Sequence, residues 1–181
     1  MREIEVKLKG SNFEELENKL KEKGCMLSEP ISQHDTIYAL KGSTNEFSQA
    51  SEGDVVIRIR RMKDKAQLTL KQQRSREGDS MEYETEVADP EAMHKILETL
   101  SWYPVVEVRK VRRKGKFGSY EVCLDEVERL GTFVELEKLC EDNADPEMVR
   151  EELFKELESL GLSRNDEETR GYDTQVFQLG K

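Results

Sequence analysis

The sequence predicts an α+β protein in which an antiparallel sheet of about eight strands forms a closed or nearly closed β-barrel, with a charged interior and helices packed outside. Several segments alternate apolar and charged residues with a period of two, which is typical of strands. Other segments carry one apolar stripe at helical spacing. The apolar sides of the strands are the partners that these stripes need, so the helices are expected there. The charged sides then face the inside when the sheet closes.

The length and composition indicate one globular domain. A chain of 181 residues suffices for one hydrophobic core, so residues 1–181 are expected to form a single domain. Charged residues make up 38% and hydrophobic residues 35% of the sequence. This composition is lean, but it is patterned, which argues against disorder. The formal net charge of −10 argues against a general binder of nucleic acid or of an anionic membrane.

The cysteines and the apolar runs favour a cytoplasmic protein. The three cysteines stand far apart and form no CxxC pair, so a disulfide framework is not expected. No apolar run approaches the ~18 residues of a membrane span. The N-terminus resembles a charged strand more than a signal peptide. We therefore expect no membrane partner.

The first strand, residues 2–8, alternates apolar and charged side chains and sets the pattern for the sheet. Residues 11–14 (Ser-Asn-Phe-Glu) resemble a capping box, and the helix that follows is expected to end at Gly24. Polar loops are expected at 41–54 and 74–80. The other strands of this half are predicted at residues 33–40, 55–62, 66–73 and 80–87.

Two helix starts in the second half share the same chemistry. Asp89-Pro90-Glu91 and Asp145-Pro146-Glu147 each place an N-cap Asp before a Pro and an acidic residue of the first turn. Residues 105–114 and 119–127 are predicted to form a hairpin that turns at 115–118. The last strands are expected at residues 131–139 and, after a polar tail, at 172–179.

Both charge signs follow the side of the strands opposite the apolar residues. The basic members are Lys7, Arg58, Arg60, Lys71, Lys110 and Arg112. The acidic members are Glu3, Glu5, Glu82, Glu84, Glu86, Asp125, Glu135 and Glu137. Such charges inside a barrel are costly unless they are paired or bind a ligand. Clustered carboxylates suit hard divalent cations, and Arg and Lys suit phosphate oxygens, so we expect the interior to bind a metal-bound polyphosphate.

The first strand also carries a family motif. Glu3-Ile4-Glu5-Val6-Lys7 resembles the ExExK signature of the CYTH superfamily, the triphosphate tunnel metalloenzymes. The later motifs follow in the order of that family, at residues 34–38, 57–60, 70–71, 82–84, 110–112, 124–127, 130–137 and 170–172. Gly171 stands where the family commonly has Ser. The resemblance covers nearly the whole chain and is strongest to class IV adenylyl cyclases and their thiamine triphosphatase relatives.

The resemblance implies roles for the interior residues. A divalent metal, Mg²⁺ or Mn²⁺, is expected on Glu3, Glu5, Asp125, Glu135 and Glu137. The phosphates of the substrate are expected on Lys7, Arg58, Arg60, Lys71, Lys110 and Arg112. The catalytic set is expected to be Glu3, Glu5, Lys7, Glu135 and Glu137. Structural ion pairing is the competing interpretation throughout.

Several residues are open to more than one interpretation. Glu82 and Glu86 are favoured as counter-charges for the arginines, and Asp35 either orients a basic residue or is an ordinary strand carboxylate. A one-residue shift of register at 109–113 would exchange the two faces there. Cys123 is interpreted as a space-filling residue. Neither a His-based triad nor a glycine-rich phosphate loop is indicated.

The resemblance implies a metal-dependent enzyme that acts on ATP, thiamine triphosphate or tripolyphosphate. The first expectation is a class IV adenylyl cyclase, which converts ATP to 3′,5′-cyclic AMP and pyrophosphate. A triphosphate phosphohydrolase, either an inorganic tripolyphosphatase or a thiamine triphosphatase, is the first alternative. A non-catalytic binder of polyphosphate or nucleotide is the second. The cyclase resemblance also implies a homodimer, and the residues identify no general base.

Overall fold

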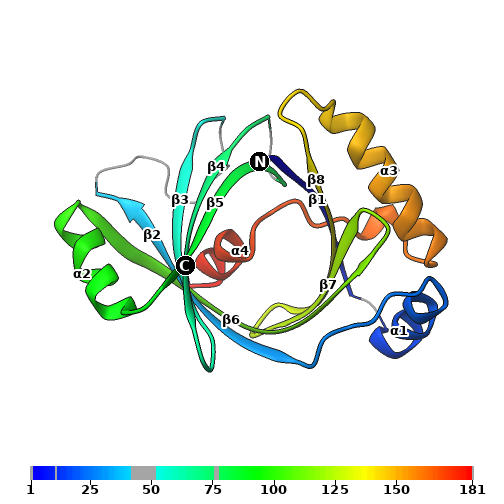
Figure 1. Ribbon diagram of the computed structural model, residues 1–181, viewed down its shortest axis with the longest axis horizontal. Helices are drawn as coiled ribbons and strands as arrows, with labels where there is room; N and C mark the ends of the chain where they lie inside the picture. The colour runs from blue at the N-terminus through cyan, green and yellow to red at the C-terminus, as the bar shows by residue number, and fades with distance from the viewer. Residues whose placement is uncertain (1, 11, 42–51, 76–77, 181) are drawn as a thin grey trace.

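The computed structural model describes residues 2–10, 12–41, 52–75 and 78–180. Figure 1 shows a ring of strands with helices around it. The strands are β1 (Arg2–Lys9), β2 (Ile31–Leu40), β3 (Val55–Arg61), β4 (Ala66–Gln73), β5 (Asp79–Val87), β6 (Trp102–Phe117), β7 (Tyr120–Val127) and β8 (Gly131–Cys140). The helices are α1 (Phe13–Glu22), α2 (Pro90–Thr99), α3 (Pro146–Ser159), the short 3₁₀ helix η1 (Arg164–Asp166) and α4 (Tyr172–Leu179).

The strands close into an antiparallel barrel in the order β1-β5-β4-β3-β2-β6-β7-β8. This confirms the predicted fold class. The β1–β8 seam runs through eight residue pairs, from Arg2 opposite Cys140 to Lys9 opposite Phe133. The β1–β5 seam has three pairs in the described part of the chain, and beyond them the Glu5 amide donates to the Gly78 carbonyl at 2.8 Å. The barrel is therefore closed by one long seam and one short seam.

The strand β6 is longer than the sequence predicts at both ends. It begins at Trp102, and its hairpin with β7 turns at residues 118–119, so the predicted turn at 115–118 is wrong. Gly115 suggested a turn, but it lies within the strand. A Cβ at this position would lie 2.6 Å from Cys25 Sγ and 2.8 Å from the Met26 carbonyl oxygen. The glycine is required because another segment packs directly against the strand.

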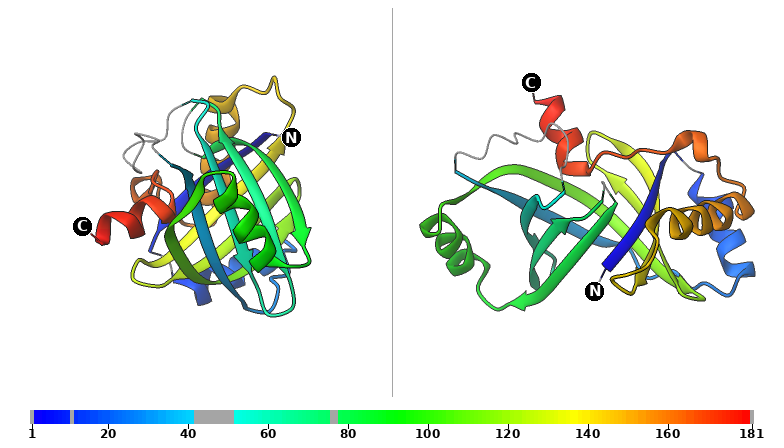
Figure 2. Two further views of the ribbon diagram at one scale, coloured as in Figure 1. Left: turned by 90° about the vertical axis from the view of Figure 1, so that its left-hand side faces the viewer. Right: turned by 90° about the horizontal axis from the view of Figure 1, so that it is seen from above.

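The last element is a helix, so the predicted strand at residues 172–179 is wrong. Eight strands already close the barrel, and no strand edge is left for this segment to join. Tyr172, Val176 and Phe177 recur at helical spacing and pack against apolar side chains inside the barrel. Figures 1 and 2 show α4 lying across one mouth of the ring of strands.

The helix caps agree with the predicted chemistry, with one shift. Asp89 and Asp145 each accept hydrogen bonds from the first-turn amides of α2 and α3, as predicted. The cap of α1 is Asn12, whose side chain accepts from the Glu15 amide at 3.5 Å. Ser11 of the predicted capping box lies outside the described residues.

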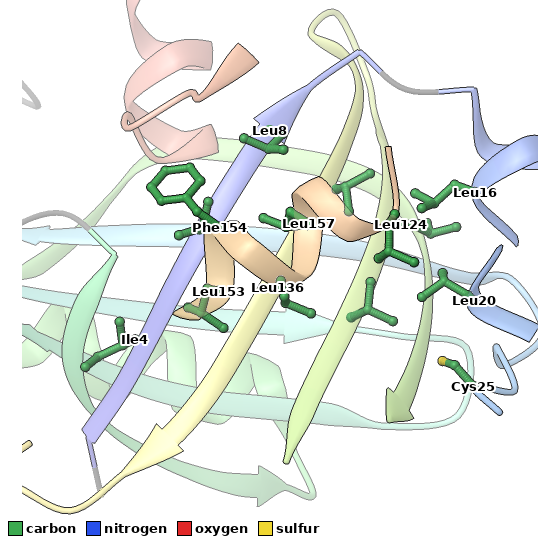
Figure 3. Packing of buried hydrophobic residues seen from close by; sticks show 14 of the residues in the cluster. Ile4, Leu8, Leu16, Leu20, Cys25, Leu124, Leu136, Leu153, Phe154 and Leu157 are labelled. Carbon is green, nitrogen blue, oxygen red and sulfur yellow. The ribbon is translucent and has the colours of Figure 1, made fainter. Parts of the chain in front are cut away.

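Three apolar clusters hold the helices against the barrel. Figure 3 shows the largest, in which α1 and α3 cover the outer sides of β1, β7 and β8. A second cluster places Leu97 of α2 against the outside of β2 and β3. The third lies inside the barrel, where α4 packs on Ile37, Val108 and Phe133. These three residues continue the inward side of their strands, so the interior is charged in its middle and apolar at the α4 mouth.

Within the described residues, we find no helix long and apolar enough to span a membrane.

Candidate functional site

A cavity of about 810 Å³ occupies the barrel. Most of the sequence-predicted site residues line it, because residues two apart on a strand point to the same side. These are Glu3, Glu5, Lys7, Arg58, Arg60, Lys71, Lys110, Arg112, Glu135 and Glu137, together with Glu82 and Glu84. Asp125 is the exception. Its carboxylate is fully buried behind two basic side chains and does not line the cavity.

Three of the predicted metal ligands form one cluster. The carboxylates of Glu3, Glu5 and Glu137 come within 4.8 Å of one another. Burial, together with the neighbouring carboxylates, raises the pKa of Glu3 to about 8, although Lys71 acts in the opposite direction. Burial and the charge of Glu3 also raise the pKa of Glu137 well above its usual range. Buried carboxylates whose pKa is raised by one another form a donor set suited to a hard divalent cation, because the cation offsets their repulsion.

The other two predicted metal ligands are occupied by cations of the protein. Asp125 accepts from Arg112 Nε at 2.7 Å and from Lys110 Nζ at 2.9 Å. Glu135 also pairs with Arg112. Burial disfavours the Glu135 carboxylate, but Arg112, Lys110 and Lys7 keep its pKa well below the usual range. Asp125 and Glu135 therefore hold Lys110 and Arg112 in position on one wall of the cavity.

Arg58 and Arg60 lie on β3, which only β2 separates from β6 in the barrel. Arg60 forms two hydrogen bonds of 2.7 Å with Asp35, so Asp35 orients a basic residue, as one of the two sequence interpretations holds. Burial alone would raise the pKa of Asp35, but Arg60 and Arg58 hold it well below its usual range. Arg58 donates to Thr69 at 3.1 Å, whereas its Nε is buried without a hydrogen-bond partner in the described part of the chain.

The acidic residues of β5 differ in position: Glu82 lies inside the cavity and Glu86 lies outside it. Glu82 lies 2.9 Å from Lys71 Nζ, and although burial opposes ionisation, Lys71 and Arg58 lower its pKa to about 2. Glu86 does not line the cavity. It is exposed, with Lys65 Nζ at 3.6 Å, so the prediction that it faces the interior as a counter-charge for the arginines is wrong. The reason is its place at the end of β5, beyond the enclosed part of the barrel.

The register at residues 109–113 places Lys110 and Arg112 inside. Arg113 points outward to the Ser28 carbonyl at 3.0 Å and to Glu17 of α1. Lys114 continues the inward series and pairs with Glu121 at 3.0 Å, which sequence reasoning missed. The alternation of inward residues at positions 110 and 112 could have predicted that Lys114 also faces the cavity.

Cys123 and His94 have contacts that are explained by structural roles. Cys123 is fully buried, and burial raises the pKa of its thiol, which agrees with a space-filling role. His94 on α2 shares a 2.8 Å hydrogen bond with the Tyr38 hydroxyl, outside the barrel. Neither histidine lines the cavity.

The family motif at 170–172 includes Tyr172, but sequence reasoning gave it no role in the site. The aromatic ring of this first residue of α4 lies 4.7 Å from Lys7 Nζ and 4.8 Å from Lys110 Nζ. Burial and the charge of Glu135 raise its pKa well above the usual range, so the hydroxyl stays protonated. The predicted strand at this position would not bring the side chain of Tyr172 next to the lysines. The helix α4, which lies across the mouth of the barrel, does.

Comparisons with known proteins agree with this geometry. A family model described as the CYTH domain matches residues 1–172. A protein of Methanocaldococcus jannaschii named "Putative adenylate cyclase" is 29% identical over 172 residues, which cover 92% of this chain and 93% of that protein. A structure from Pyrococcus horikoshii OT3 has a TM-score of 0.79 at 25% identity, covering 96% of this chain and 98% of that one.

A third likeness concerns the fold alone. A plant structure from Hippeastrum has a TM-score of 0.64 at 23% identity and covers 99% of this chain and 96% of that one. That protein is described as a "Putative adenylyl cyclase" that reveals a dominant triphosphatase activity.

Proposed function

Because the chain belongs to the CYTH domain family, we propose that it is a divalent-metal-dependent enzyme that acts on a triphosphate inside the barrel. The proposed reaction converts ATP to 3′,5′-cyclic AMP and pyrophosphate. The observation that carries the proposal is that three clustered carboxylates and all six predicted basic side chains line the same cavity. Carboxylates bind a hard cation and basic side chains bind phosphate oxygens, so the two sets together suit a metal-bound triphosphate.

The proposed metal site consists of Glu3, Glu5 and Glu137. Their oxygens lie close together and repel one another, and this donor set fits Mg²⁺ or Mn²⁺. A cation bound there would neutralise part of the negative charge of the phosphate chain. Glu135 and Asp125 contribute differently, since they orient Lys110 and Arg112.

The proposed role of the basic side chains is to hold and align the phosphates. Arg58 and Arg60 lie on β3, Lys110 and Arg112 on β6, and Lys7 and Lys71 on β1 and β4. In the cyclase reaction, the ribose 3′-oxygen attacks the α-phosphorus while the bond from that phosphorus to the bridging oxygen breaks. Fixed cations favour this step because they stabilise the charge that builds up on the departing pyrophosphate.

Triphosphate hydrolysis is the second candidate function. The same cations would align a terminal phosphoryl group for attack by water. The triphosphatase activity described for the Hippeastrum protein favours it. By contrast, the apolar part of the cavity wall at Ile37, Val56 and Val108 favours a triphosphate that carries an organic group. The two candidates differ in which oxygen is held in line with the reacting phosphorus.

Product analysis tests the proposal. The protein is incubated with Mg²⁺ or Mn²⁺ and, separately, ATP, thiamine triphosphate and inorganic tripolyphosphate, and the products are resolved by chromatography. Cyclic AMP with pyrophosphate supports the cyclase. Orthophosphate without cyclic nucleotide supports the hydrolase, and binding without turnover would make the protein a non-catalytic binder.

A matched pair of variants ties any turnover to the site. Glu5→Gln removes one carboxylate of the cluster, whereas Glu86→Gln makes the same chemical change at an exposed position outside the cavity. Turnover should be lost in the first and kept in the second. The proposed homodimer is tested separately by light scattering of the purified protein.

A further inference from the structure

The N-terminus of α4 enters the charged part of the cavity. Val176 and Phe177 anchor the helix on the apolar mouth of the barrel, where they pack in one cluster with Ile37 and Phe133. The first turn therefore faces inward, and Gly171, Tyr172, Asp173 and Thr174 all line the cavity. Among these, Tyr172 is the residue that lies beside two lysines.

The ring of Tyr172 touches both basic side chains at this end of the charged interior. Lys7 Nζ, from β1, lies 4.7 Å from the ring centroid, and Lys110 Nζ, from β6, lies 4.8 Å from it. The edge of the ring packs on Phe133 with centroids 5.0 Å apart, which fixes its tilt. Cation–π attraction keeps two ammonium groups beside one aromatic ring. The ring thus holds two phosphate-binding candidates from different strands next to each other.

The hydroxyl of Tyr172 is buried and is left without a well-formed hydrogen bond among the described residues. The Glu135 carboxylate lies close enough to interact with it, but Glu135 is itself held by Arg112. A buried hydroxyl without a partner costs folding free energy, so such a group in a cavity indicates a missing ligand atom. The phenol donates a hydrogen bond, and the ligand atom it suits is an acceptor.

The start of α4 points to the same kind of ligand. Its N-cap is Gly171, which offers no side chain to cap the first turn. The Thr174 amide donates to the Asp173 carboxylate at 2.8 Å, whereas the positive end of the helix dipole still faces a cavity that contains Lys7 and Lys110, which favours an anion there. The acceptor expected beside Tyr172 is therefore a phosphate oxygen.

We infer that Tyr172 is a substrate-contacting residue whose hydroxyl donates a hydrogen bond to a phosphoryl oxygen held between Lys7 and Lys110. The inference rests on the proposed function, because it assumes that a triphosphate occupies the cavity. It adds α4 to the substrate-binding elements, beyond the strand residues to which the sequence analysis assigned roles.

The test compares Tyr172→Phe with Tyr83→Phe. The first variant keeps the ring, its packing on Phe133 and both lysine contacts, and it removes only the hydroxyl. Tyr83 is 62% exposed on the outside of β5, so the second variant makes the same chemical change away from the cavity. The probe is the bis-methylene analogue of tripolyphosphate, whose phosphorus–carbon bridges cannot be hydrolysed, titrated by calorimetry in the presence of Mg²⁺.

Tyr172→Phe should lower the affinity for the analogue about tenfold, the usual loss for a hydrogen bond to a charged group. The melting temperature of the free protein should stay the same or rise, because the variant removes a buried hydroxyl that has no partner. Tyr83→Phe should change neither quantity. A purely structural tyrosine would show the opposite combination, a lower melting temperature with unchanged affinity.

Two outcomes would overturn the inference, and they are distinguishable. Wild-type affinity in Tyr172→Phe would reject the contact and leave the proposed function intact. Failure of the wild-type protein to bind the analogue would reject the proposed function, and the contact with it. Tyr172→Leu adds a second check, since loss of the ring as well as the hydroxyl should lower affinity further than Tyr172→Phe does.

Discussion

The interior contains two kinds of acidic side chain that differ in their neighbours. Asp35 and Asp125 each accept hydrogen bonds from a guanidinium group, and both are buried beside the cations that they hold. Glu3 and Glu137 lie beside other carboxylates, and burial with this crowding raises the pKa of both. The first kind is satisfied by the protein itself. In the second kind the nearby cations do not outweigh burial and crowding, and a proton or an added cation relieves them. The neighbours of a carboxylate therefore separate structural acids from candidate metal ligands.

The largest expected effect is on the paired kind. Asp125→Asn leaves the charges of Lys110 and Arg112 buried with Glu135 as the remaining close partner. Breaking a buried ion pair from one side costs about 3–5 kcal/mol. Urea unfolding at neutral pH measures this loss. A change below about 1 kcal/mol would mean that Asp125 is not needed to balance these cations, and its assignment to the paired kind would fail.

Glu5→Gln should act in the opposite direction on stability. Removing one charge from the cluster relieves repulsion on Glu3 and Glu137, so the metal-free protein should become more stable by about 1 kcal/mol. Metal-dependent turnover should fall by at least about 100-fold, because a proposed ligand is lost. Thermal unfolding with and without Mg²⁺ gives the first quantity, and product formation gives the second. A destabilised variant that keeps its turnover would place Glu5 among the paired acids.

The short seam of the barrel contains a third case, the buried pair of Arg2 and Asp79. Arg2 donates to Asp79 at 2.6 and 2.7 Å, and its other nitrogen reaches the carbonyls of Asp142 and Ala144. Burial would raise the pKa of Asp79, but Arg2 and Ser75 lower it. A carboxyl with a lowered pKa stabilises the fold above its unfolded pKa of about 3.9, and this contribution is lost as the pH falls through its folded pKa.

Asp79→Asn should therefore weaken the acid dependence of unfolding below about pH 4. At neutral pH it should cost about 2 kcal/mol, less than Asp125→Asn, because the two carbonyl groups remain as partners for Arg2. The measurement is a series of urea unfolding curves between acid and neutral pH. Parallel curves for the wild type and the variant would show that Asp79 does not contribute to the acid limb.

The comparison also shows what the sequence could reveal. A period of two identifies which residues share a side, and it correctly predicted that Lys110 and Arg112 face inward. It does not reveal which neighbour each residue meets across the barrel. The alternation correctly placed Asp125 on the inward side, but it could not show that Arg112 lies within hydrogen-bonding distance. Asp125 was therefore grouped with the metal ligands, whereas its contact with Arg112 makes it a partner for that cation.

Two further features depended on contacts that lie far apart along the chain. By alternation, Arg2 lies on the same outer, apolar side of β1 as Ile4, where a charged residue has no evident partner. In the structure, Arg2 binds Asp79 and the loop before α3. Residues 172–179 are compatible with a strand or a helix by composition. The closed barrel decides between them, because it offers an apolar mouth to fill and no strand edge to extend.

The smallest expected effect is at the rim. Glu86 and Lys65 lie 3.6 Å apart with both side chains at least half exposed, so the pair is screened by water. Glu86→Gln should change the free energy of unfolding by less than about 0.5 kcal/mol and leave turnover unchanged. Glu86 shares its alternation with Glu82 and Glu84 but, unlike them, does not line the cavity. If Glu86→Gln altered metal-dependent turnover as strongly as Glu5→Gln, position on the inward side of a strand would matter more than enclosure, and the distinction between the two kinds of acid would not hold.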